Sequence, residues 1–405
     1  MSHYGILKAI NPRSNGEVIV VEPILISGAG PVGLSLALAL TSRGIPVVVL
    51  ERRPIAGWEF RATTFHPPTL EMFHRWGILG RLDELGCRTR VLQYWDRSRR
   101  ALIAEFDYNQ LSDVTDFPFC LQCSQHLVVR ELYDALQKSG LADVRLGTEI
   151  VDFNNDGGVE VIVESHGQSA AIKGAVLCAA DGRDSFVRRR LEIAFEGEVY
   201  AEPLLLIGTT IEMGDFFRGM KDVSHIIDTH QWVIVTALGN ETRMIFGLEP
   251  GANPVQAQTN EAIKMRVAAL LGREADYCIQ HRAVHTVHRK IATRFAEKYV
   301  ALLGDAAHLL SPVLGSGLNC GIHDADAYAD AIVSFTKGSG DITALHSAAE
   351  RRREKTAHQV QNRAHAEYLR LSEIKLNEPS ITDIARTPAL ARKHLLRTSL
   401  MADRG

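Results

Sequence analysis

The sequence predicts an α/β fold in which a largely antiparallel sheet is inserted into a parallel α/β layer, with helices at the C-terminal end. Three observations predict it. A strand, a glycine-rich turn, a helix and a second strand follow one another over residues 24–51. Residues 197–288 are rich in strand patterns. A strand that starts at Val300 then leads into another glycine-rich turn and a long helix, so the chain returns to the parallel layer.

The first unit is the best-defined part of the sequence. Residues 24–26 are apolar and run into the turn that contains Gly28, Gly30 and Gly33. Leucines at every second position and several alanines then indicate a buried helix that ends near Gly44. The strand 47–50 follows and is closed by Glu51. This order predicts a Rossmann-like βαβ unit that binds a dinucleotide.

The rest of the chain predicts an interrupted domain. We expect a helix at 69–76, a hairpin over 91–117 that leaves the first lobe, and a helix at 127–136 with a strand pair at 149–153 and 159–164 that return to it. The clearest strands of the inserted sheet are 204–211, 231–238 and 242–247. Helices follow residue 337, and we interpret Glu350–Lys355 as a solvated helix face. The predicted domains are 21–90, 118–196 and 289–340 for the dinucleotide, 91–117 and 197–288 for the inserted sheet, and 341–405 for the C-terminal helices and tail.

Composition restricts the partners. The 45 basic residues nearly balance the 48 acidic ones, so we expect neither nucleic acid nor a membrane surface as a partner. No apolar run is long enough for a signal peptide or a spanning helix, and six cysteines are too few for a disulfide framework. We therefore expect a cytoplasmic protein, a monomer or homodimer. Cys120 and Cys123 form a CxxC, but no second pair completes a zinc site, and we predict no metal.

The glycine turn has the residues that a pyrophosphate needs. Glycines allow a sharp turn and a close approach of the backbone to the phosphates at the helix N-terminus. Glu51, at the end of the next strand, can accept hydrogen bonds from a ribose diol. Strand, helix and acidic residue are in register, which favours dinucleotide binding over a merely tight turn, although the motif alone does not separate FAD from NAD.

Two further segments carry a family resemblance. One contains Asp181-Gly182, and the other contains Gly304-Asp305 and continues to Asn319. With the N-terminal glycine motif they form an ordered set of three that resembles the class A flavoprotein monooxygenases, the family of para-hydroxybenzoate hydroxylase, from about Pro23 to about Arg370. The resemblance implies an FAD-binding domain, a substrate domain in the inserted sheet, and hydroxylation of an aromatic ring with NAD(P)H and O2 through a flavin C4a-hydroperoxide.

The resemblance also implies roles for individual residues. Glu51 would bind the adenosine ribose, Arg61 would reach the pyrophosphate, and Gln125 would contact the flavin. Asp305 would bind the ribityl chain, and Pro312 would lie beside the ring that is oxygenated. The full set of predicted cofactor residues is Gly28, Gly30, Val32, Gly33, Glu51, Arg52, Arg61, Gln125, Asp181, Gly304, Asp305, Pro312, Gly315, Gly317, Leu318 and Asn319. The last two would meet the isoalloxazine through backbone and side chain.

Two departures from the family pattern bear on the substrate. Ser316 stands where most relatives have a glutamine. No arginine that could hold a benzoate carboxylate is evident near residues 229–235, which disfavours a benzoate. The run that starts at Arg61 resembles relatives that act on nitrophenols or hydroxypyridines. A small phenolic or hydroxy-heteroaromatic substrate is therefore expected.

Few acid–base residues are needed, because the flavin carries the difficult chemistry. A histidine could still deprotonate the substrate hydroxyl, and the candidates are His66, His225 and His230, with Pro312 beside the ring. For each histidine a surface or hydrogen-bonded role is the alternative. His281, His285 and His288 are better explained by a strand than by a metal site, because the third points to the opposite face. His308 is better explained by packing in a helical turn than by metal ligation.

Three other functions fit the same fold. A flavin halogenase would show a WxWxIP motif, but the four tryptophans stand far apart. A prenyl-chain reductase is a further alternative. A non-catalytic FAD-fold protein, as the GDP dissociation inhibitors are, would have no need of the Asp181-Gly182 and Gly304-Asp305 segments.

Overall fold

The computed structural model describes residues 9–12, 18–56, 63–228, 231–338, 341–372 and 381–403. Its centre is a six-stranded sheet in the order β10-β4-β3-β14-β23-β22. All neighbours pair in parallel except β22 with β23. The bounds are β3 (Ile24–Ser27), β4 (Val47–Glu51), β10 (Ala142–Leu146), β14 (Val176–Ala179), β22 (Ala296–Glu297) and β23 (Val300–Leu302). The sheet thus joins segments almost 300 residues apart, as expected for an interrupted domain.

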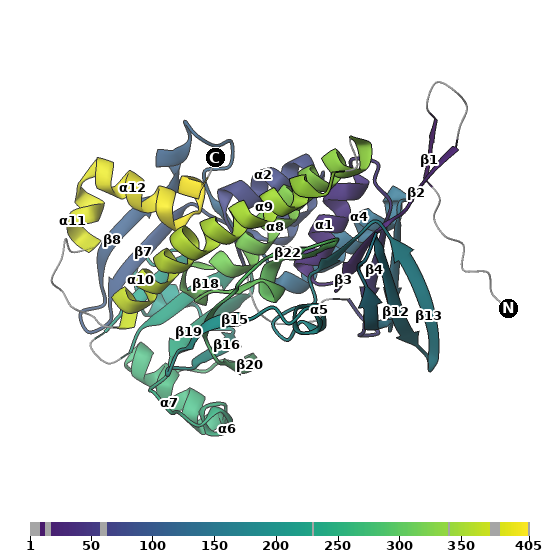
Figure 1. Ribbon diagram of the computed structural model, residues 1–405. Helices are drawn as coiled ribbons and strands as arrows, with labels where there is room; N and C mark the ends of the chain where they lie inside the picture. Colours follow the sequence, from purple (N-terminus) through teal and green to yellow (C-terminus); the bar gives the residue numbers. More distant parts are fainter. Residues whose placement is uncertain are drawn as a thin grey trace.

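Helices cover the parallel sheet and explain its apolar strands. Every residue of β3, β14 and β23 is buried, because elements lie on both faces of the sheet. The helix α1 (Pro31–Thr41) is itself buried on nearly all sides between the sheet, α4 (Gln125–Ser139) and α8 (Ser316–Lys337), and α8 packs on α9 (Thr343–Lys355) (Figure 1). Burial on all sides explains why the sequence of α1 is apolar all round. The shorter helices α2 (Pro67–Arg75) and α3 (Leu79–Leu85) follow β4 in the chain.

The strand pair expected at 149–153 and 159–164 does form, but in a sheet of its own. The strands β11 (Glu149–Asn154), β12 (Val159–Ser165) and β13 (Gln168–Gly174) make a three-stranded antiparallel sheet beside the parallel one. Burial alternates along β12, as in a sheet with one solvated face, whereas β3, β14 and β23 of the parallel sheet are buried throughout. Other small sheets are β1-β2 (Ala9–Pro12, Val18–Val21) and β5-β9-β6 (Thr64–Phe65, Cys120–Gln122, Cys87–Thr89).

The second large sheet has seven strands in the order β20-β16-β19-β18-β17-β7-β8. Only β7 and β17 pair in parallel. The bounds are β7 (Val91–Asp96), β8 (Ala101–Asp107), β16 (Leu204–Thr209), β17 (Val223–Ile227), β18 (Val233–Leu238), β19 (Glu241–Gly247) and β20 (Ile279–His285). The expected hairpin after residue 91 therefore joins the strands beyond residue 197 in one sheet.

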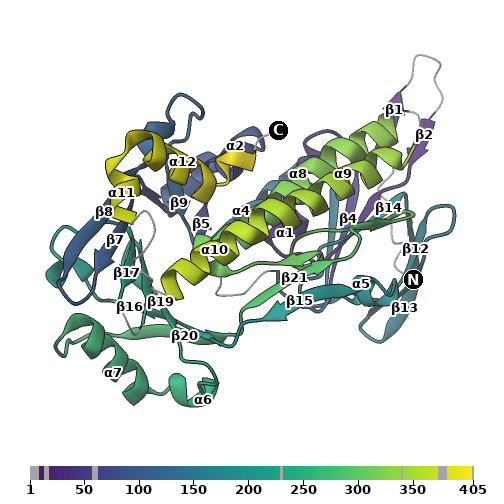
Figure 2. The same cartoon turned by 60° about the vertical axis from the view of Figure 1, so that its left-hand side comes forward.

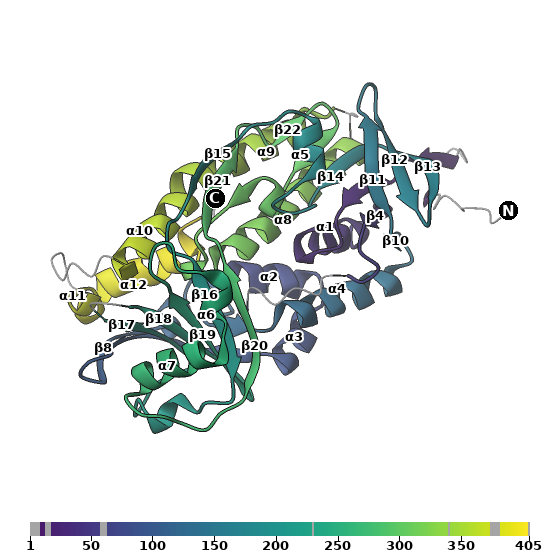
Figure 3. The same cartoon turned by 90° about the horizontal axis from the view of Figure 1, so that it is seen from below.

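The two faces of this sheet have different covers. Figure 3 shows α7 (Asn260–Leu271) over β16, β19 and β20, with α6 (Pro254–Ala257) next to it. Apolar residues of α7, among them Ile263 and Val267, share a core with Leu205 and Phe246. The opposite face packs partly on the C-terminal helices α10 (Gln361–Ser372), α11 (Ile381–Arg386) and α12 (Pro388–Thr398).

Where the chain passes from one large sheet to the other and back, its two segments pair as strands. The strands β15 (Phe195–Val199) and β21 (His288–Ala292) pair in antiparallel fashion, and β21 also pairs with β24 (His308–Leu309). The boundaries expected near 197 and 288 fall within this pair. The exact domain limits stay a prediction.

A continuous helical path spans both sheets. Figure 2 shows α9 and α10 running in one line from the parallel sheet to the seven-stranded sheet, with a π-helical turn at Thr356–Val360 between them. The solvated face expected at Glu350–Lys355 holds for Glu350, which pairs with Arg353. It is wrong for Arg352, which is only 8% exposed. Among the helices that the structure describes, none has the length and apolarity that a membrane crossing requires.

Candidate functional site

One cavity of about 800 Å³ lies between the two large sheets. The turns that follow β3, β4, β14 and β23 all contribute to its lining. These are the carboxyl ends of parallel strands, where open α/β sheets place their ligands. The lining includes the predicted residues Gly28, Gly30, Val32, Glu51, Arg52, His66, Gln125, Asp181, His225, Asp305, Pro312, Gly315, Gly317 and Leu318. Segments that are far apart in the sequence therefore share one continuous cavity.

The glycine turn has two kinds of glycine. Gly28 has a φ of 102°, and a Cβ there would lie 2.4 Å from the carbonyl oxygen of Ala180, so only glycine fits. Gly30 caps α1 in an extended conformation, and a Cβ there would meet nothing within 4 Å. Gly33 lies behind the cavity lining and packs on Gly28. Gly28 thus allows the close packing of the strands, whereas Gly30 leaves room next to the start of the helix.

Glu51 ties the second strand to the glycine turn. Its Oε2 accepts a hydrogen bond of 2.9 Å from the backbone N–H of Ala29, and its Oε1 accepts one from Arg53. A carboxylate has about four lone-pair sites, so these two bonds leave capacity for a diol. Glu51 and Arg52 both line the cavity.

Asp181 and Asp305 enter the cavity from the next two strands. One carboxylate oxygen of Asp181 accepts the N–H of Val187 at 3.2 Å, at the start of α5 (Phe186–Arg190). The other is buried without a hydrogen-bond partner among the described residues, and burial raises the pKa of Asp181. Asp305 lies in the short 3-10 helix Gly304–Ala306 after β23 and lines the cavity, while Gly304 lies behind it.

The loop before α8 closes the same side of the cavity. Pro312 begins the 3-10 helix Pro312–Leu314, and Gly315 follows with a φ of 64°. No side chain of the described residues caps the N-terminus of α8. Gly317 and Leu318, in the first turn of α8, line the cavity, and the N–H groups of that turn offer partial positive charge to an electron-rich ligand. Ser316 is buried, and its Oγ lacks a hydrogen-bond partner within the described chain.

Asn319 has a different task from the one expected for its side chain. Its Oδ1 accepts bonds from the backbone of His66 and the hydroxyl of Thr69, at 3.0 and 2.6 Å. Its Nδ2 donates to the carbonyl oxygens of Thr64 and Gly315, both at 2.8 Å. The side chain is fully buried and its hydrogen-bonding capacity is used by the protein. We therefore correct the expected flavin contact: the Asn319 side chain fastens the β5 segment to the start of α8.

His66 also has a structural role, whereas the sequence suggested it as a base for the substrate hydroxyl. Its Nε2 donates to the carbonyl oxygen of Leu314 at 2.8 Å, and its Nδ1 lies 3.3 Å from the sulfur of Cys120. Burial lowers the pKa of His66 to about 4, so the ring is neutral at pH 7. Both ring nitrogens have protein partners, which leaves neither for a substrate proton.

His225 fits the role of a substrate-facing histidine better. It lines the cavity from β17, and its Nδ1 is buried with no hydrogen-bond partner among the described residues. Burial lowers the pKa of His225 to about 4, so the neutral ring can accept a hydrogen bond. Its ring meets Tyr94 edge to face at 5.0 Å. Arg61 and His230 lie outside the described residues, and their roles stay predictions.

The strand explanation for the other histidines holds only in part. His281 and His285 lie on β20, but His288 starts β21, and two residues separate β21 from β20. His281 pairs with Glu241 at 3.0 Å, while His285 and His288 line the cavity. The cysteines of the CxxC are both buried, and burial raises the pKa of each thiol to about 12.

The sequence did not reveal the inner chamber of the cavity. Alternate residues of four strands point into it: Leu204 and Leu206, Val223 and His225, Ile234 and Thr236, Arg243 and Ile245. Leu205, Val235 and Met244, which alternate with these residues, belong to the core under α7. Tyr108 and Cys120 add to the chamber. The sequence signal that could have revealed the chamber is a polar residue on the same face of each of three largely apolar strands: His225, Thr236 and Arg243.

The sequence shows no arginine near residues 229–235 that could hold a carboxylate, but the neighbouring strand β19 supplies one to the chamber. Arg243 is 2% exposed and lines the chamber, and its Nε donates to Glu241 at 3.1 Å. Burial lowers the pKa of Arg243, and Glu241 opposes that shift. Arg243 thus places N–H donors in the chamber, and Glu241 balances much of its positive charge.

These features fit an extended dinucleotide with a ring at one end. The open space at Gly30, the partnerless buried oxygen of Asp181 and the uncapped start of α8 lie along one cavity of the volume that cofactor sites have. The fold and the site define an FAD-binding oxidoreductase.

The comparison with protein families agrees. The model of the FAD binding domain family matches residues 22–364, and the chain belongs to this family, as one of its class A flavoprotein monooxygenases. Para-nitrophenol 4-monooxygenase of Pseudomonas sp. is 28% identical over 80% of this chain and 81% of that protein. Pentachlorophenol 4-monooxygenase of Sphingobium chlorophenolicum is 30% identical over 75% of this chain, which spans 56% of that relative's length. A third relative, 6-hydroxy-3-succinoylpyridine 3-monooxygenase of Pseudomonas putida, is 27% identical over 82% of this chain and 85% of its own length.

A solved structure shows the same fold. The crystal structure of p-nitrophenol 4-monooxygenase from Pseudomonas putida superposes with a TM-score of 0.87 and covers 93% of this chain and 97% of its own, at 24% identity. The predicted fold, a Rossmann-like FAD-binding domain with an inserted sheet and C-terminal helices, is thereby confirmed.

Proposed function

We propose that the protein hydroxylates a small phenolic or hydroxy-heteroaromatic compound, with FAD as cofactor and NAD(P)H and O2 as co-substrates. The observation that carries the proposal is the single cavity that joins the glycine turn to an apolar chamber under the seven-stranded sheet. A ring cofactor at the start of α8 would face that chamber. Three relatives whose names state phenol or hydroxypyridine monooxygenation support this substrate class.

The chamber suits a small aromatic ring. Its walls are mostly branched aliphatic side chains, which favour a flat apolar molecule and exclude water. The polar groups are few: Tyr108, His225, Thr236 and the Arg243–Glu241 pair. Because Glu241 balances much of the charge of Arg243, the pair fits a polar ring substituent better than a free carboxylate. The substrate we propose is therefore a phenol with a neutral polar substituent or a hydroxypyridine.

The FAD would be held by the residues along the outer cavity. The start of α1 with Gly30 would receive the pyrophosphate, Glu51 the adenosine ribose, and Asp305 the ribityl chain. When bound, FAD supplies the redox chemistry that activates O2. His225 would accept a hydrogen bond from the substrate hydroxyl and orient the ring, and the aliphatic walls would exclude water.

NAD(P)H has no separate binding motif in this sequence. A second glycine turn coupled to a strand is missing from the 405 residues, so we propose that the nicotinamide reaches the flavin by transient docking. A cytoplasmic location, which the sparse cysteines favour, and a monomeric or dimeric state stay predictions.

The test is a product assay with purified protein reconstituted with FAD. Phenols and hydroxypyridines are screened for stimulated NADH or NADPH oxidation, and each hit is incubated with isotopically labelled O2. We expect a product that carries one labelled oxygen atom. A matched variant, Ile234→Trp, fills the chamber and should retain FAD while losing product formation. Substrate-independent oxidation with no labelled product from any compound of these classes would refute the proposal.

A further inference from the structure

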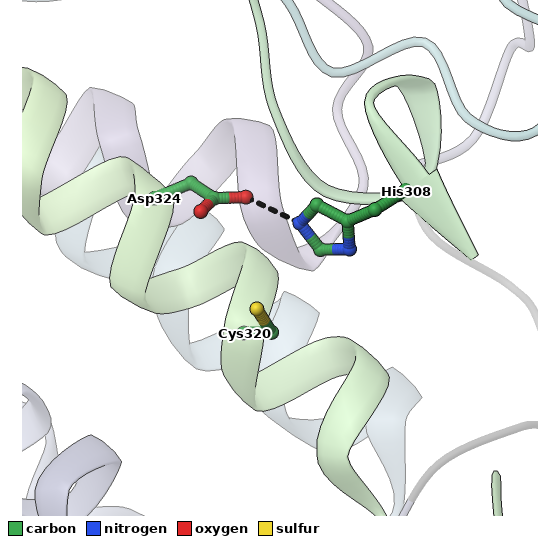
Figure 4. Close-up of side chains that lie close together, drawn as sticks. All are labelled: His308, Cys320 and Asp324. Atoms are coloured by element: carbon green, nitrogen blue, oxygen red, sulfur yellow. Dashed lines mark hydrogen bonds and ion pairs between the residues drawn. The ribbon is translucent and has the colours of Figure 1, made fainter. Parts of the chain in front are cut away.

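A buried charged cluster lies directly behind the turn that carries Asp305. It consists of His308 in β24, Cys320 and Asp324 in α8, and Arg352 in α9. Figure 4 shows the imidazole of His308 pointing at the carboxylate of Asp324, with the thiol of Cys320 one turn of α8 away. The sulfur, nitrogen and oxygen atoms of these three residues lie within 4.8 Å of one another. Neither the glycine motif nor the cavity lining includes this cluster.

Asp324 is the centre of the cluster. Its Oδ2 accepts a bond of 2.6 Å from Nε2 of His308 and one of 3.1 Å from the backbone N–H of Gly304. Its Oδ1 accepts a bond of 2.6 Å from Nε of Arg352. Burial alone would raise the pKa of Asp324, but Arg352 and His308 outweigh it and lower that pKa to about 2. The carboxylate is therefore ionised at neutral pH.

The arginine makes this an ion network instead of a metal site. Arg352 also donates from Nη2 to the carbonyl oxygen and the sulfur of Cys320, both at 3.2 Å. Its guanidinium thus contacts two of the three groups that could bind a metal. A metal ion would bring a second positive charge to the same buried place, which the geometry does not accommodate.

The network reaches the cofactor side through Gly304. This residue has a φ of 60°, and a Cβ on it would lie 3.1 Å from Val32 of α1, so the turn requires glycine here and passes close to α1. From behind, Asp324 holds its N–H. The next residue, Asp305, lines the cavity. The turn that presents Asp305 thus lies between Val32 and the carboxylate of Asp324, and Asp324 holds its backbone from behind.

We infer that Asp324 and Arg352 are positioning residues, which hold the Gly304-Asp305 turn in the geometry that binds FAD. The inference rests on the proposed role of Asp305 at the ribityl chain. It makes FAD retention depend on α9, a helix that lies outside the cavity lining. An asparagine at position 324 cannot replace the carboxylate, because its NH2 group would face one of three donors.

The test compares FAD with ADP as ligands of the apoprotein. ADP contains the adenosine and diphosphate of FAD but neither its ribityl chain nor its isoalloxazine ring. Its affinity therefore reports only on the half of the cofactor site that contains Gly28 and Glu51. We expect Asp324→Asn to weaken FAD binding by about 10- to 100-fold, as is usual for a lost buried charged hydrogen bond. ADP affinity should stay within about twofold, because the first half of the site is untouched.

Two further variants sharpen the comparison. Arg352→Lys keeps the charge but loses the forked contact with Asp324 and Cys320, and should weaken FAD binding less than Asp324→Asn. It also serves if Asp324→Asn does not fold. The matched control is Asp326→Asn, the same substitution on the same helix. Asp326 pairs with Arg75 at 2.6 Å and does not contact the turn, so FAD affinity should be unchanged.

The double variant Asp305→Ala with Asp324→Asn decides whether Asp324 acts through Asp305. We expect it to bind FAD no more than about twofold more weakly than Asp305→Ala alone. A full multiplication of the two effects, or equal losses of FAD and ADP affinity in Asp324→Asn, would overturn the inference while the proposed FAD site stands. Unchanged FAD affinity in Asp305→Ala would overturn both the proposed role of Asp305 and the inference.

Discussion

The backbone N–H of His66 donates a hydrogen bond of 3.0 Å to Oδ1 of Asn319, although 253 positions separate the two residues. The same oxygen accepts from Thr69, and the amide nitrogen of Asn319 donates to Thr64 and Gly315. One buried amide thus joins the segment after the glycine unit to the loop at the far end of the cavity.

Replacement of Asn319 should therefore destabilise the apoprotein itself. Asn319→Ala leaves several buried groups without partners, and we expect a loss of about 2–4 kcal/mol in the free energy of unfolding. Urea unfolding at constant m-value measures it. The control Asn362→Ala, at an exposed position of α10, should change that free energy by less than about 0.5 kcal/mol. A small effect of Asn319→Ala on unfolding, together with a large loss of FAD affinity, would restore a direct flavin contact.

The two glycines of the first turn should respond differently to the same change. In Gly28→Ala the new Cβ would lie 2.4 Å from the Ala180 carbonyl oxygen at a φ of 102°, so we expect loss of about 2 kcal/mol or more of stability. In Gly30→Ala the methyl group meets no protein atom within 4 Å and the backbone is extended. That variant should unfold like the wild type, yet bind FAD at least about tenfold more weakly, because the methyl group lies where the cofactor approaches.

Thermal unfolding of the two apoproteins and titration with FAD measure this difference. Each variant is the control of the other. Equal stability of Gly28→Ala and Gly30→Ala would contradict the packing argument. Unchanged FAD affinity in Gly30→Ala would remove the glycine turn from the cofactor site.

The sequence predicts what depends on local pattern. The strand, turn and helix around Gly28 are encoded within about 30 residues, and so are the turns at Asp181 and Asp305, because each ends a short apolar strand. Their meeting in one cavity follows from the rule for carboxyl ends of parallel strands.

The contacts that were missed join residues far apart in sequence. Nothing near Asn319 indicates that its amide binds Thr64, and nothing near Asp324 indicates His308. Arg352 could have been recognised, because Leu345, Ala348 and Ala349 precede it at helical spacing on the buried face of α9. The charged residues around it concealed this pattern.

Stability should depend on pH through buried histidines whose pKa values are shifted in opposite directions. Burial lowers the pKa of His66 and His225 to about 4, below the ordinary value of 6.5. Their contribution to stability is therefore present above pH 6.5 and is lost as the pH falls toward 4, at up to about 1.4 kcal/mol per pH unit for each group. For His308, burial lowers the pKa, but Cys320 and Asp324 outweigh it and raise the pKa to about 10. Its contribution is present below pH 6.5 and is lost as the pH rises toward 10.

The apoprotein should accordingly be most stable near pH 6.5. The variant His225→Phe removes one acid-sensitive group and should reduce the loss of unfolding free energy between pH 6.5 and pH 4. Thr236→Val, also in the chamber, removes no titrating group and should keep the wild-type slope. Identical slopes in His225→Phe and the wild type would contradict the assignment of a neutral buried His225.

The cysteines should differ sharply in reactivity. Thiolates react and thiols do not, and burial raises the pKa of Cys120, Cys123 and Cys178 to about 12. Cys278 is the exposed cysteine of the chain, whose six cysteines are all described. Iodoacetamide at pH 7.5 should therefore modify Cys278 first and leave Cys120, Cys123 and Cys178 unmodified in the folded protein, as peptide mass spectrometry can measure. Cys278→Ser should remove the fast phase while leaving FAD binding unchanged. Rapid modification of Cys120 or Cys123 would instead indicate a reactive CxxC and would contradict the raised pKa of these thiols.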